Sequence, residues 1–294
     1  MQRKILITGT SGFLGGYLLK FSPKEVIILA QYLKHPIQSK FDNVKFKKID
    51  LTRFAMNELL EFKPEVIIHI AAISSIDFCQ VNSESARMIN LEATKKLVDL
   101  ANKVEARFIF TSTDSVFDGK KGNYSEKDIP NPINVYAETK YKSEQFISEN
   151  LANAVIVRPA LFYGIALNEN ASFTQIMLEK LKAGKSVNTF TDQYRTPLPV
   201  SQLARAIWEL VELDFCGPIH IGGSQRISRY DMGKILCERF NLPSDLVVPV
   251  TSSQANQAAI RPRDCSLDIS LARSLLKTGF LDYDEGIEHA FRAP

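Results

Sequence analysis

The chain has 294 residues, of which 45% are hydrophobic and 23% charged, as is typical of a globular protein with one large or two ordinary domains. Its formal net charge of +3 is too small to indicate a nucleic-acid partner or binding to an anionic membrane surface. The longest apolar stretch, residues 66–73, is far shorter than the roughly 20 residues that a membrane-spanning helix needs.

The N-terminus and the cysteines predict a cytoplasmic protein. The apolar run after Arg3 and Lys4 breaks at Gly9, which is too early for a signal peptide. The four cysteines lie far apart and form no C-x-x-C pair, which favours reduced thiols over a disulfide framework or a metal site. No compact metal-ligand motif is present either, so the sequence predicts no metal-binding residues and leaves a metal requirement open.

A glycine-rich turn follows the first predicted strand. The apolar run Ile5–Ile7 leads into Gly9, Gly12 and Gly15, and a helical pattern of apolar residues begins at once. This layout is typical of a dinucleotide site, because the glycines permit a tight turn, a close approach to a pyrophosphate and close packing of helix on strand. The helix N-terminus would also face the phosphates. A plain structural turn is the alternative. The cofactor-binding candidates here are Gly9, Ser11, Gly12, Phe13, Leu14 and Gly15.

The second predicted strand, Val26–Leu29, bears on the choice of cofactor. In NAD-binding units an acidic residue at the end of this strand binds the ribose 2′-hydroxyl. Here Gln31 and Tyr32 follow the strand, and no carboxylate comes before Asp42. The missing acid removes the repulsion that would exclude a 2′-phosphate, so we expect NADP, with NAD as the alternative. Lys34 is either a phosphate partner or a solvated loop residue.

A third predicted strand, Val44–Ile49, ends at Asp50 and Leu51. The carboxyl end of a parallel strand is where a ligand lies in this type of sheet, so both residues are cofactor-binding candidates. Asp50 could accept a hydrogen bond from an adenine amino group, or cap a helix expected over Arg53–Phe62. The sequence leaves these two roles open.

The next apolar run, Glu65–Ile70, predicts a buried strand that ends at Ala71 and Ala72. These small residues would let a cofactor pass close over the strand end, and both are candidates for contact with it. His69 lies inside the strand and is interpreted as a core histidine.

Helix and strand continue to alternate further along the chain. A long helical pattern covers Ser83–Val104, and Arg107–Thr111 forms the next strand. This alternation predicts an α/β protein with a Rossmann-type, doubly wound parallel sheet.

The catalytic candidates follow that strand. Thr113 lies at its carboxyl end, and Tyr136 and Lys140 are four residues apart on a helix that Asn134 can cap. A phenol has an ordinary pKa of about 10, and a nearby ammonium group would lower it. A proton donor, a residue that tunes it and an orienting hydroxyl are what carbonyl reduction by hydride requires. The alternative for a lone Y-x-x-x-K pattern is an ordinary helix surface.

These motifs give the chain a resemblance to the extended short-chain dehydrogenases/reductases, and most of all to the dTDP-4-dehydrorhamnose reductase branch. The resemblance implies that Thr113, Tyr136 and Lys140 form a catalytic triad, and that Lys140 also holds the nicotinamide ribose. It further implies a homodimer and hydride transfer from NAD(P)H to C4 of a nucleotide-linked 4-keto-6-deoxysugar. The segments that carry it are Thr8–Gly15, Ser112–Gly119, Pro132–Lys140 with Glu144, Arg158–Pro159, Asp192–Pro197, Leu203–Ala204, Arg261–Pro262 and Ser266–Asp268.

Three positions depart from the family pattern. Ser115 stands where the family usually has tyrosine, Leu198 follows Pro197 where threonine is usual, and Arg195 is uncommon in the rhamnose enzymes. These departures leave the particular sugar open. Because Asp114 is followed by serine and not by glutamate, the acid–base pair of the related 4,6-dehydratases is incomplete.

The second half of the chain predicts a smaller substrate-binding lobe. We assign residues 1–165 to a cofactor-binding domain and 166–294 to the lobe, with residues 218–223 rejoining the main sheet. The expected elements are helices over Phe173–Ala183, Ser201–Leu213 and Tyr230–Phe240, and strands over Val155–Pro159, Ile219–Ile221 and Leu246–Val250.

The substrate-binding candidates combine residues from both halves of the chain. A guanidinium group suits phosphate oxygens, so arginines of the lobe are candidates for the substrate's pyrophosphate, although they could equally be surface residues beside turn prolines. The candidates are Thr113, Asp114, Arg195 and Arg261, with Arg263 a weaker one.

Three functions are compatible with these features. The first is a reductase of a nucleotide-linked keto sugar. The second is a nucleotide-sugar epimerase, which would use the same triad without net consumption of cofactor. The third is a non-catalytic regulatory subunit that keeps the fold and the cofactor, as some relatives in this branch do.

Overall fold

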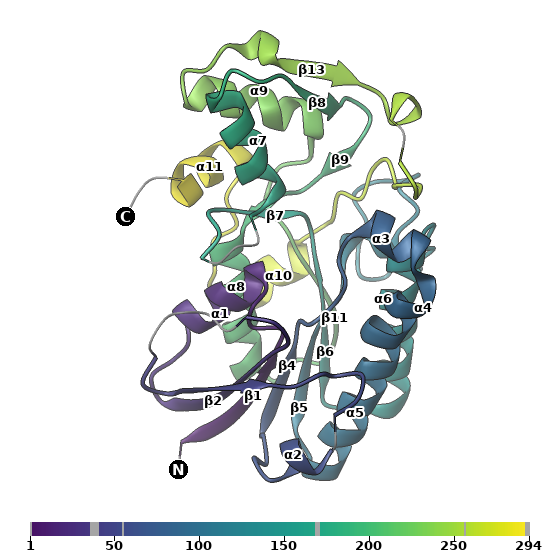
Figure 1. Cartoon of the computed structure of the whole chain (residues 1–294), viewed down its shortest axis with the longest axis vertical. Helices are drawn as coiled ribbons and strands as arrows, with labels where there is room; N and C mark the ends of the chain where they lie inside the picture. Colours follow the sequence, from purple (N-terminus) through teal and green to yellow (C-terminus); the bar gives the residue numbers. More distant parts are fainter. Residues whose placement is uncertain (1, 36–40, 55, 168–170, 256, 292–294) are drawn as a thin grey trace.

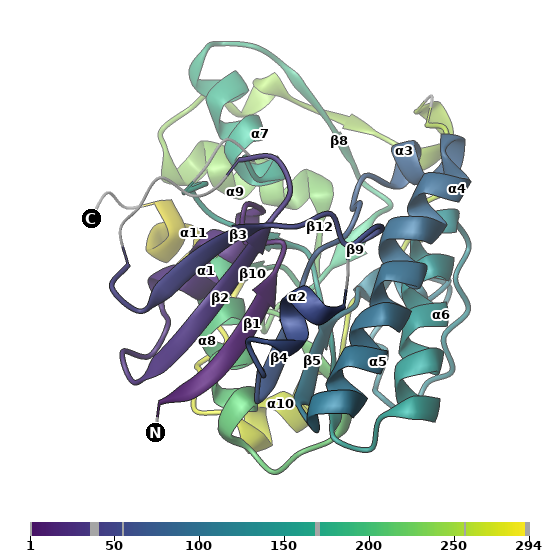
Figure 2. The same ribbon diagram turned by 60° about the horizontal axis from the view of Figure 1, so that its bottom comes forward.

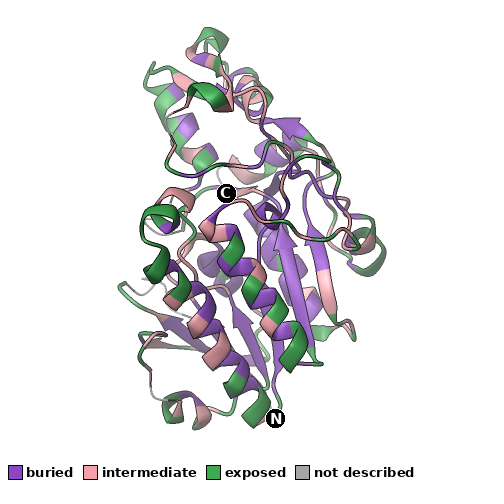
Figure 3. Ribbon diagram, turned by 90° about the vertical axis from the view of Figure 1, so that its right-hand side faces the viewer, coloured by how far each residue is buried: buried purple, intermediate pink, exposed green. Residues whose placement is uncertain are grey.

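The computed structural model describes residues 2–35, 41–54, 56–167, 171–255 and 257–291. A sheet with helices on both faces forms the lower part of the molecule, and a smaller group of helices and short strands lies above it (Figure 1). The helices that cover the sheet bury one side and expose the other, as the alternating colours along them show (Figure 3).

Seven strands of the described residues form the main sheet, in the order β11-β6-β5-β4-β1-β2-β3, and every neighbouring pair is parallel. The order reverses direction between β1 and β4, as in a doubly wound sheet, so the predicted fold class is confirmed. The strands are β1 (Arg3–Thr8), β2 (Val26–Tyr32), β3 (Val44–Lys48), β4 (Val66–His69), β5 (Arg107–Thr111), β6 (Ala154–Pro159) and β11 (Gly217–Ile221).

Alternating side chains of the strands supply two cores. In β1, Ile5 and Ile7 belong to one buried cluster and Leu6 to the other. The first cluster is covered by α1 (Phe13–Lys20), α8 (Val200–Glu212) and α10 (Ser270–Leu275). The second is covered by α2 (Asn57–Leu60), α5 (Ala93–Val104) and α6 (Val135–Asn150), of which α5 and α6 lie side by side (Figure 2).

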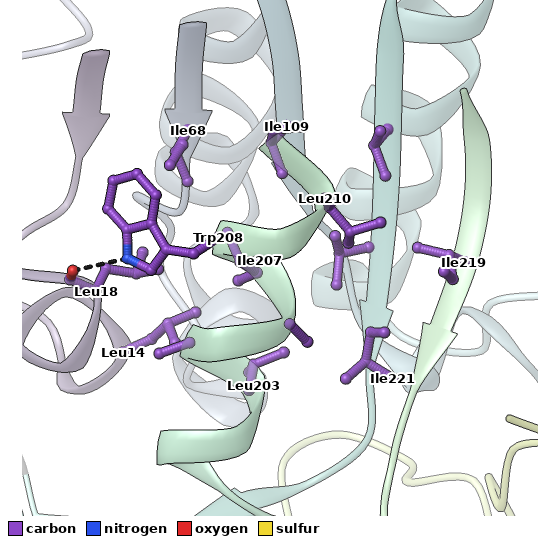
Figure 4. Packing of buried hydrophobic residues seen from close by; sticks show 14 of the residues in the cluster. Leu14, Leu18, Ile68, Ile109, Leu203, Ile207, Trp208, Leu210, Ile219 and Ile221 are labelled. Carbon is purple, nitrogen blue, oxygen red and sulfur yellow. Dashed lines mark hydrogen bonds between the residues drawn. The ribbon is translucent and has the colours of Figure 1, made fainter. Parts of the chain in front are cut away.

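Helix α8 packs beside α1 and against the sheet in the first core. Its residues Leu203, Ile207 and Leu210 point toward the strands (Figure 4). The indole N–H of Trp208 donates a hydrogen bond to the Leu18 carbonyl at 2.9 Å, which ties α8 to the helix that follows the glycine turn.

The long helical pattern over Ser83–Val104 is present but contains a π-helical turn. It consists of α4 (Ser83–Ala86), the π-helix η1 (Arg87–Glu92) and α5. Turns of this kind often occur at functional sites. Here the turn carries Asn90, whose side chain contacts the loop after β4.

The helix expected over Arg53–Phe62 is shorter than predicted. Only Asn57–Leu60 is helical, and Ala55 lies outside the described residues. The Asp50 carboxylate accepts hydrogen bonds from the N–H and hydroxyl of Thr52, so a turn occupies the start of the expected helix.

The upper lobe has its own core, which three helices share: α7 (Phe173–Lys182), α9 (Arg229–Arg239) and α11 (Tyr283–Phe291). Segments of the second half nevertheless return to the main sheet, because β11 pairs with β6 and α8 covers the first core. The division near residue 165 therefore stays a proposal. The remaining elements are α3 (Ile76–Val81), η2 (Asp114–Val116), β7 (Phe162–Tyr163), β8 (Val187–Phe190), β9 (Tyr194–Arg195), β10 (Leu198–Pro199), β12 (Ile227–Ser228), η3 (Ser244–Leu246), β13 (Val247–Val250) and η4 (Ser252–Gln254).

We expect Gly15→Ala to destabilise the protein by about 1–3 kcal/mol, because it overpacks the contact between α1 and the glycine turn. A Cβ at Gly15 would lie 2.5 Å from the Cα of Thr10, whereas at Gly279 it would meet nothing within 4 Å. Gly279→Ala is therefore the matched control. Urea unfolding of both variants measures the difference, and equal stabilities would contradict the close packing.

Candidate functional site

A cavity of about 370 Å³ lies at the carboxyl ends of β1, β2, β4 and β5. Every residue predicted to bind the cofactor borders it, although these residues come from separate parts of the chain. Their contact with a cofactor stays a prediction. The residues brought together are Gly9, Ser11, Gly12, Phe13, Leu14, Gly15, Asp50, Leu51, Ala71, Ala72, Tyr136 and Lys140.

The glycine turn is held by close backbone contacts. Gly9 has a φ of +74°, which favours glycine, and a Cβ there would lie 2.7 Å from the Cα of Ala71. The Gly12 N–H donates to the Gly9 carbonyl at 2.9 Å, and α1 begins at the next residue. The first turn of α1 therefore borders the cavity, as a dinucleotide site requires.

Gln31 supports this turn from β2. Its side-chain oxygen accepts a hydrogen bond from the Gly9 N–H at 2.8 Å, and its side-chain nitrogen donates to the Ile49 carbonyl at 2.6 Å. The Gln31 carbonyl also accepts from the N–H and hydroxyl of Thr10. The sequence showed only that an acid is missing here, whereas the structure gives Gln31 a bracing role. The signal available in the sequence was a polar residue, Gln31, directly after the apolar run Val26–Ala30.

Asp50 does not cap the helix expected over Arg53–Phe62, because α2 begins only at Asn57; its carboxylate instead accepts hydrogen bonds from Thr52 in a turn. Hydrogen bonds from Thr52 lower the pKa of the Asp50 carboxyl, and the residue is exposed at the cavity edge. The structure does not test the adenine role.

His69 is a core residue, as predicted. Its ring nitrogens lie 2.7 Å from the Thr8 hydroxyl and 2.9 Å from the Thr94 hydroxyl. Burial lowers the pKa of His69 to about 3, so the ring is neutral at pH 7.

A second cavity of about 260 Å³ adjoins the first, and Ser112, Tyr136 and Phe162 border both. The predicted substrate-binding residues Thr113, Asp114, Arg195 and Arg261 all line this second cavity, together with Gln193 and Arg229.

Tyr136 lies in the first turn of α6, where the two cavities meet. Asn134 caps this helix through a hydrogen bond from the Ala137 N–H at 3.0 Å, as predicted. Burial raises the pKa of Tyr136, and a hydrogen bond with Thr113 opposes the rise. The phenol is therefore protonated at neutral pH.

The expectation that Lys140 lowers the pKa of Tyr136 is not met. Burial lowers the pKa of Lys140 itself to about 7, although the Glu144 carboxylate opposes this shift. Lys140 is therefore less readily charged than an exposed lysine, which weakens its influence on the phenol. Its Nζ lies 4.0 Å from the ring centroid of Phe110, a cation–π contact with a residue of β5.

A buried ion pair fixes α6 on the sheet one turn beyond Lys140. The guanidinium of Arg158 in β6 donates two hydrogen bonds from Nε to Glu144, both at 3.1 Å, and one from Nη2 at 2.6 Å. Both side chains are almost fully buried. Asn90 contacts the same helix, because its side-chain nitrogen donates to the Thr139 hydroxyl at 3.1 Å.

Arg195 lines the second cavity, but the surrounding protein engages its guanidinium. Nε lies 3.3 Å from the Asp114 carboxylate, and the other nitrogens donate to the carbonyls of Tyr194, Pro262 and Arg263. Burial raises the pKa of Asp114, and the charge of Arg195 opposes this. The role of Arg195 in the structure is thus to position Asp114 and the segment after Arg261.

Arg261 is paired with Asp77 of α3 through two hydrogen bonds, at 3.0 and 2.8 Å. This pair joins the C-terminal segment to the first half of the chain beside the second cavity. The bond from Arg261 lowers the pKa of Asp77.

Arg229 also lines the cavity and was missed by the sequence analysis. It is the first residue of α9, and no local motif around it indicated a ligand.

Among the described residues, no group of three or more His, Cys, Asp or Glu side chains is arranged to hold a metal ion. No helix in the described ranges is both long and apolar enough to span a membrane. The cysteines Cys79, Cys216, Cys237 and Cys265 are all free.

Comparison with known proteins gives a family match. The model of the family described as "RmlD substrate binding domain" matches residues 3–293. Among curated proteins, methionine adenosyltransferase 2 subunit beta from Bos taurus is 31% identical over 284 residues, which cover 93% of this chain and 83% of that protein.

Solved structures are similar over almost the whole chain. A hypothetical dTDP-4-dehydrorhamnose reductase from Sulfolobus tokodaii has a TM-score of 0.85 and 37% identity, with 96% of this chain and 98% of that chain covered. A dTDP-4-dehydrorhamnose reductase from Bacillus anthracis in complex with NADP has a TM-score of 0.87 and 26% identity, with 99% of each chain covered.

We expect Glu144→Gln to lower the free energy of unfolding by about 3–5 kcal/mol, because it leaves the buried charge of Arg158 uncompensated. Glu138→Gln on the same helix removes only the exposed pair with Lys142 and should cost less than about 0.5 kcal/mol. Urea unfolding at pH 7 compares the two variants. Similar losses in both would contradict a structural role for the buried pair.

Proposed function

This chain belongs to the RmlD substrate binding domain family of extended short-chain dehydrogenases/reductases, and we propose that it is an NADPH-dependent reductase of a nucleotide-linked 4-keto-6-deoxysugar. The observation that carries this proposal is the position of Tyr136 between the two cavities, with Thr113 beside it in the second cavity and Lys140 one helical turn further along α6.

The first cavity has the features that a dinucleotide needs. Small residues from two strand ends and the start of α1 surround it, and side chains at Gly9 or Gly15 would collide with neighbouring backbone. NADPH, when bound there, would supply the hydride that adds to C4 of the sugar. Lys140 borders this cavity and, as the family resemblance implies, would hold the nicotinamide ribose.

Tyr136 would donate the proton that the reduced carbonyl oxygen needs. A general acid must carry its proton before the reaction, and burial keeps the phenol of Tyr136 protonated by raising its pKa. Thr113 would share the same substrate oxygen and orient the carbonyl. Hydride and proton together convert the carbonyl to an alcohol, so this arrangement favours reduction.

The second cavity would hold the sugar nucleotide. It contains both polar groups for a sugar, such as Thr113 and Asp114, and the guanidinium groups that suit a diphosphate. The similar protein from Sulfolobus tokodaii is named as a dTDP-4-dehydrorhamnose reductase, which supports this class of substrate.

NADP is the preferred cofactor in this proposal. The similar Bacillus anthracis reductase was crystallised with NADP, and Gln31 stands in this chain where an acid would repel a 2′-phosphate. We further propose a cytoplasmic homodimer, in line with the free thiols of the chain and the family resemblance.

A regulatory role is the second candidate. The curated relative from Bos taurus is named as a subunit of methionine adenosyltransferase, so the fold also occurs in a protein named as a subunit of another enzyme. The convergence of Thr113, Tyr136 and Lys140 on the two cavities favours catalysis. An epimerase would use the same residues but would leave the cofactor unconsumed.

We expect Tyr136→Phe to lower turnover about 10²–10⁴-fold with little change in cofactor binding, because it removes only the proton donor. The assay follows NADPH oxidation with a dTDP-linked 4-keto-6-deoxysugar, and NADH is run in parallel. Tyr141→Phe is the matched control, since this tyrosine follows the catalytic lysine but borders neither cavity. Turnover of Tyr136→Phe within a few-fold of the wild type would overturn the proposed role.

A further inference from the structure

The second cavity contains an imbalance of charge. Three arginines and one aspartate line it, and Asp77 lies just behind Arg261. Arg195 is paired with Asp114, and Arg261 with Asp77, so each of these two arginines already has a carboxylate partner within the protein. Among the described residues, no Asp or Glu carboxylate oxygen lies within 4.0 Å of a guanidinium nitrogen of Arg229.

Arg229 is nevertheless held firmly in place. Its backbone N–H donates to the Gln193 carbonyl at 2.9 Å, and Ser228 caps the helix that it begins. The guanidinium lies over the ring of Phe173, with the Cζ atom 3.8 Å from the ring centroid. Stacking of this kind fixes the plane of the group and leaves its N–H edge available for hydrogen bonds in that plane.

The pairing of β12 with β9 brings Arg229 close to Arg195. Ile227 pairs with Arg195 in this short antiparallel ladder, two residues before Arg229. Burial lowers the pKa of Arg229 to about 10, the nearby charge of Arg195 adds to this shift, and Tyr283 and Asp114 oppose it. Arg229 is half-buried at the cavity wall, so its charge is only partly solvated and an anion bound beside it would compensate that charge.

The geometry points to Arg229 as the residue that pairs with the diphosphate of a nucleotide-linked substrate in the second cavity. This inference rests on the proposed function, since it takes the substrate to carry a diphosphate. It changes the roles expected from the sequence. Arg195 positions Asp114, and Arg229, which the motifs did not indicate, supplies the charge that recognises the substrate.

Calorimetric titration of the full-length chain tests the inference. The protein is first saturated with NADPH to fill the first cavity and is then titrated with thymidine diphosphate or with thymidine. The variants are Arg229→Gln, Arg229→Lys and, as the matched control, Arg226→Gln. Arg226 also lies over an aromatic ring, 3.7 Å from the centroid of Tyr194, but it is paired with Asp264 and does not line the cavity.

Arg229→Gln should weaken binding of thymidine diphosphate about 10- to 100-fold, the range expected for the loss of a hydrogen bond between charged groups. Binding of thymidine should stay within about twofold, Arg229→Lys should retain part of the affinity, and Arg226→Gln should leave both affinities unchanged. The melting temperature of Arg229→Gln without nucleotide should equal or exceed that of the wild type, because the variant removes an unpaired cation.

Two results would overturn the inference. One is an equal affinity of the wild type and Arg229→Gln for thymidine diphosphate. The other is an equal loss for nucleotide and nucleoside, together with a lower melting temperature, which would mark a purely structural role. Because the titration does not measure turnover, a chain that never oxidises NADPH would contradict the proposed reductase and leave the role of Arg229 intact.

Discussion

The buried ion pair between Glu144 and Arg158 is the contact on which the arrangement of the site depends. It joins α6 to β6 with both partners almost fully buried, so the helix has a fixed position on the sheet. Tyr136 and Lys140 lie on the same helix, two turns and one turn before Glu144. Because the strand ends and the start of α1 are fixed to the same sheet, the phenol comes to lie where the two cavities meet.

The parts of the site that could be predicted from the sequence are those set by local chemistry. Glycine spacing reports the backbone geometry of the turn, and residues four apart on a helix share a face. The position of Arg229 could not be predicted, because it depends on the register between β9 and β12 and on the stacking of Arg229 on Phe173. The helix expected over Arg53–Phe62 was predicted too long because the side chain of Asp50 stabilises a local turn at its start, and α2 covers only Asn57–Leu60.

The two cavities differ in the charge of the side chains that line them. The first is lined mainly by small and apolar residues, so backbone groups and the start of α1 give it its character. The second contains a cluster of guanidinium groups, most of them already paired with carboxylates. Such pairing limits the net charge of the second cavity and makes an unpaired arginine the point of recognition. Reduction would then need a hydride from the cofactor in the first cavity and a proton from the phenol at the boundary, which burial keeps protonated.

In the proposed reaction, a hydride passes from NADPH to the sugar, and one NADPH is oxidised for each sugar that is reduced. The most direct test uses NADPH that carries deuterium at the transferable position of the nicotinamide, together with a dTDP-linked 4-keto-6-deoxysugar. The account predicts one deuterium at C4 of the sugar in the product, detected by mass spectrometry and NMR, for each NADPH consumed. Bound cofactor that stays unconsumed, with no deuterium in the sugar, would contradict it and favour an epimerase or a regulatory subunit.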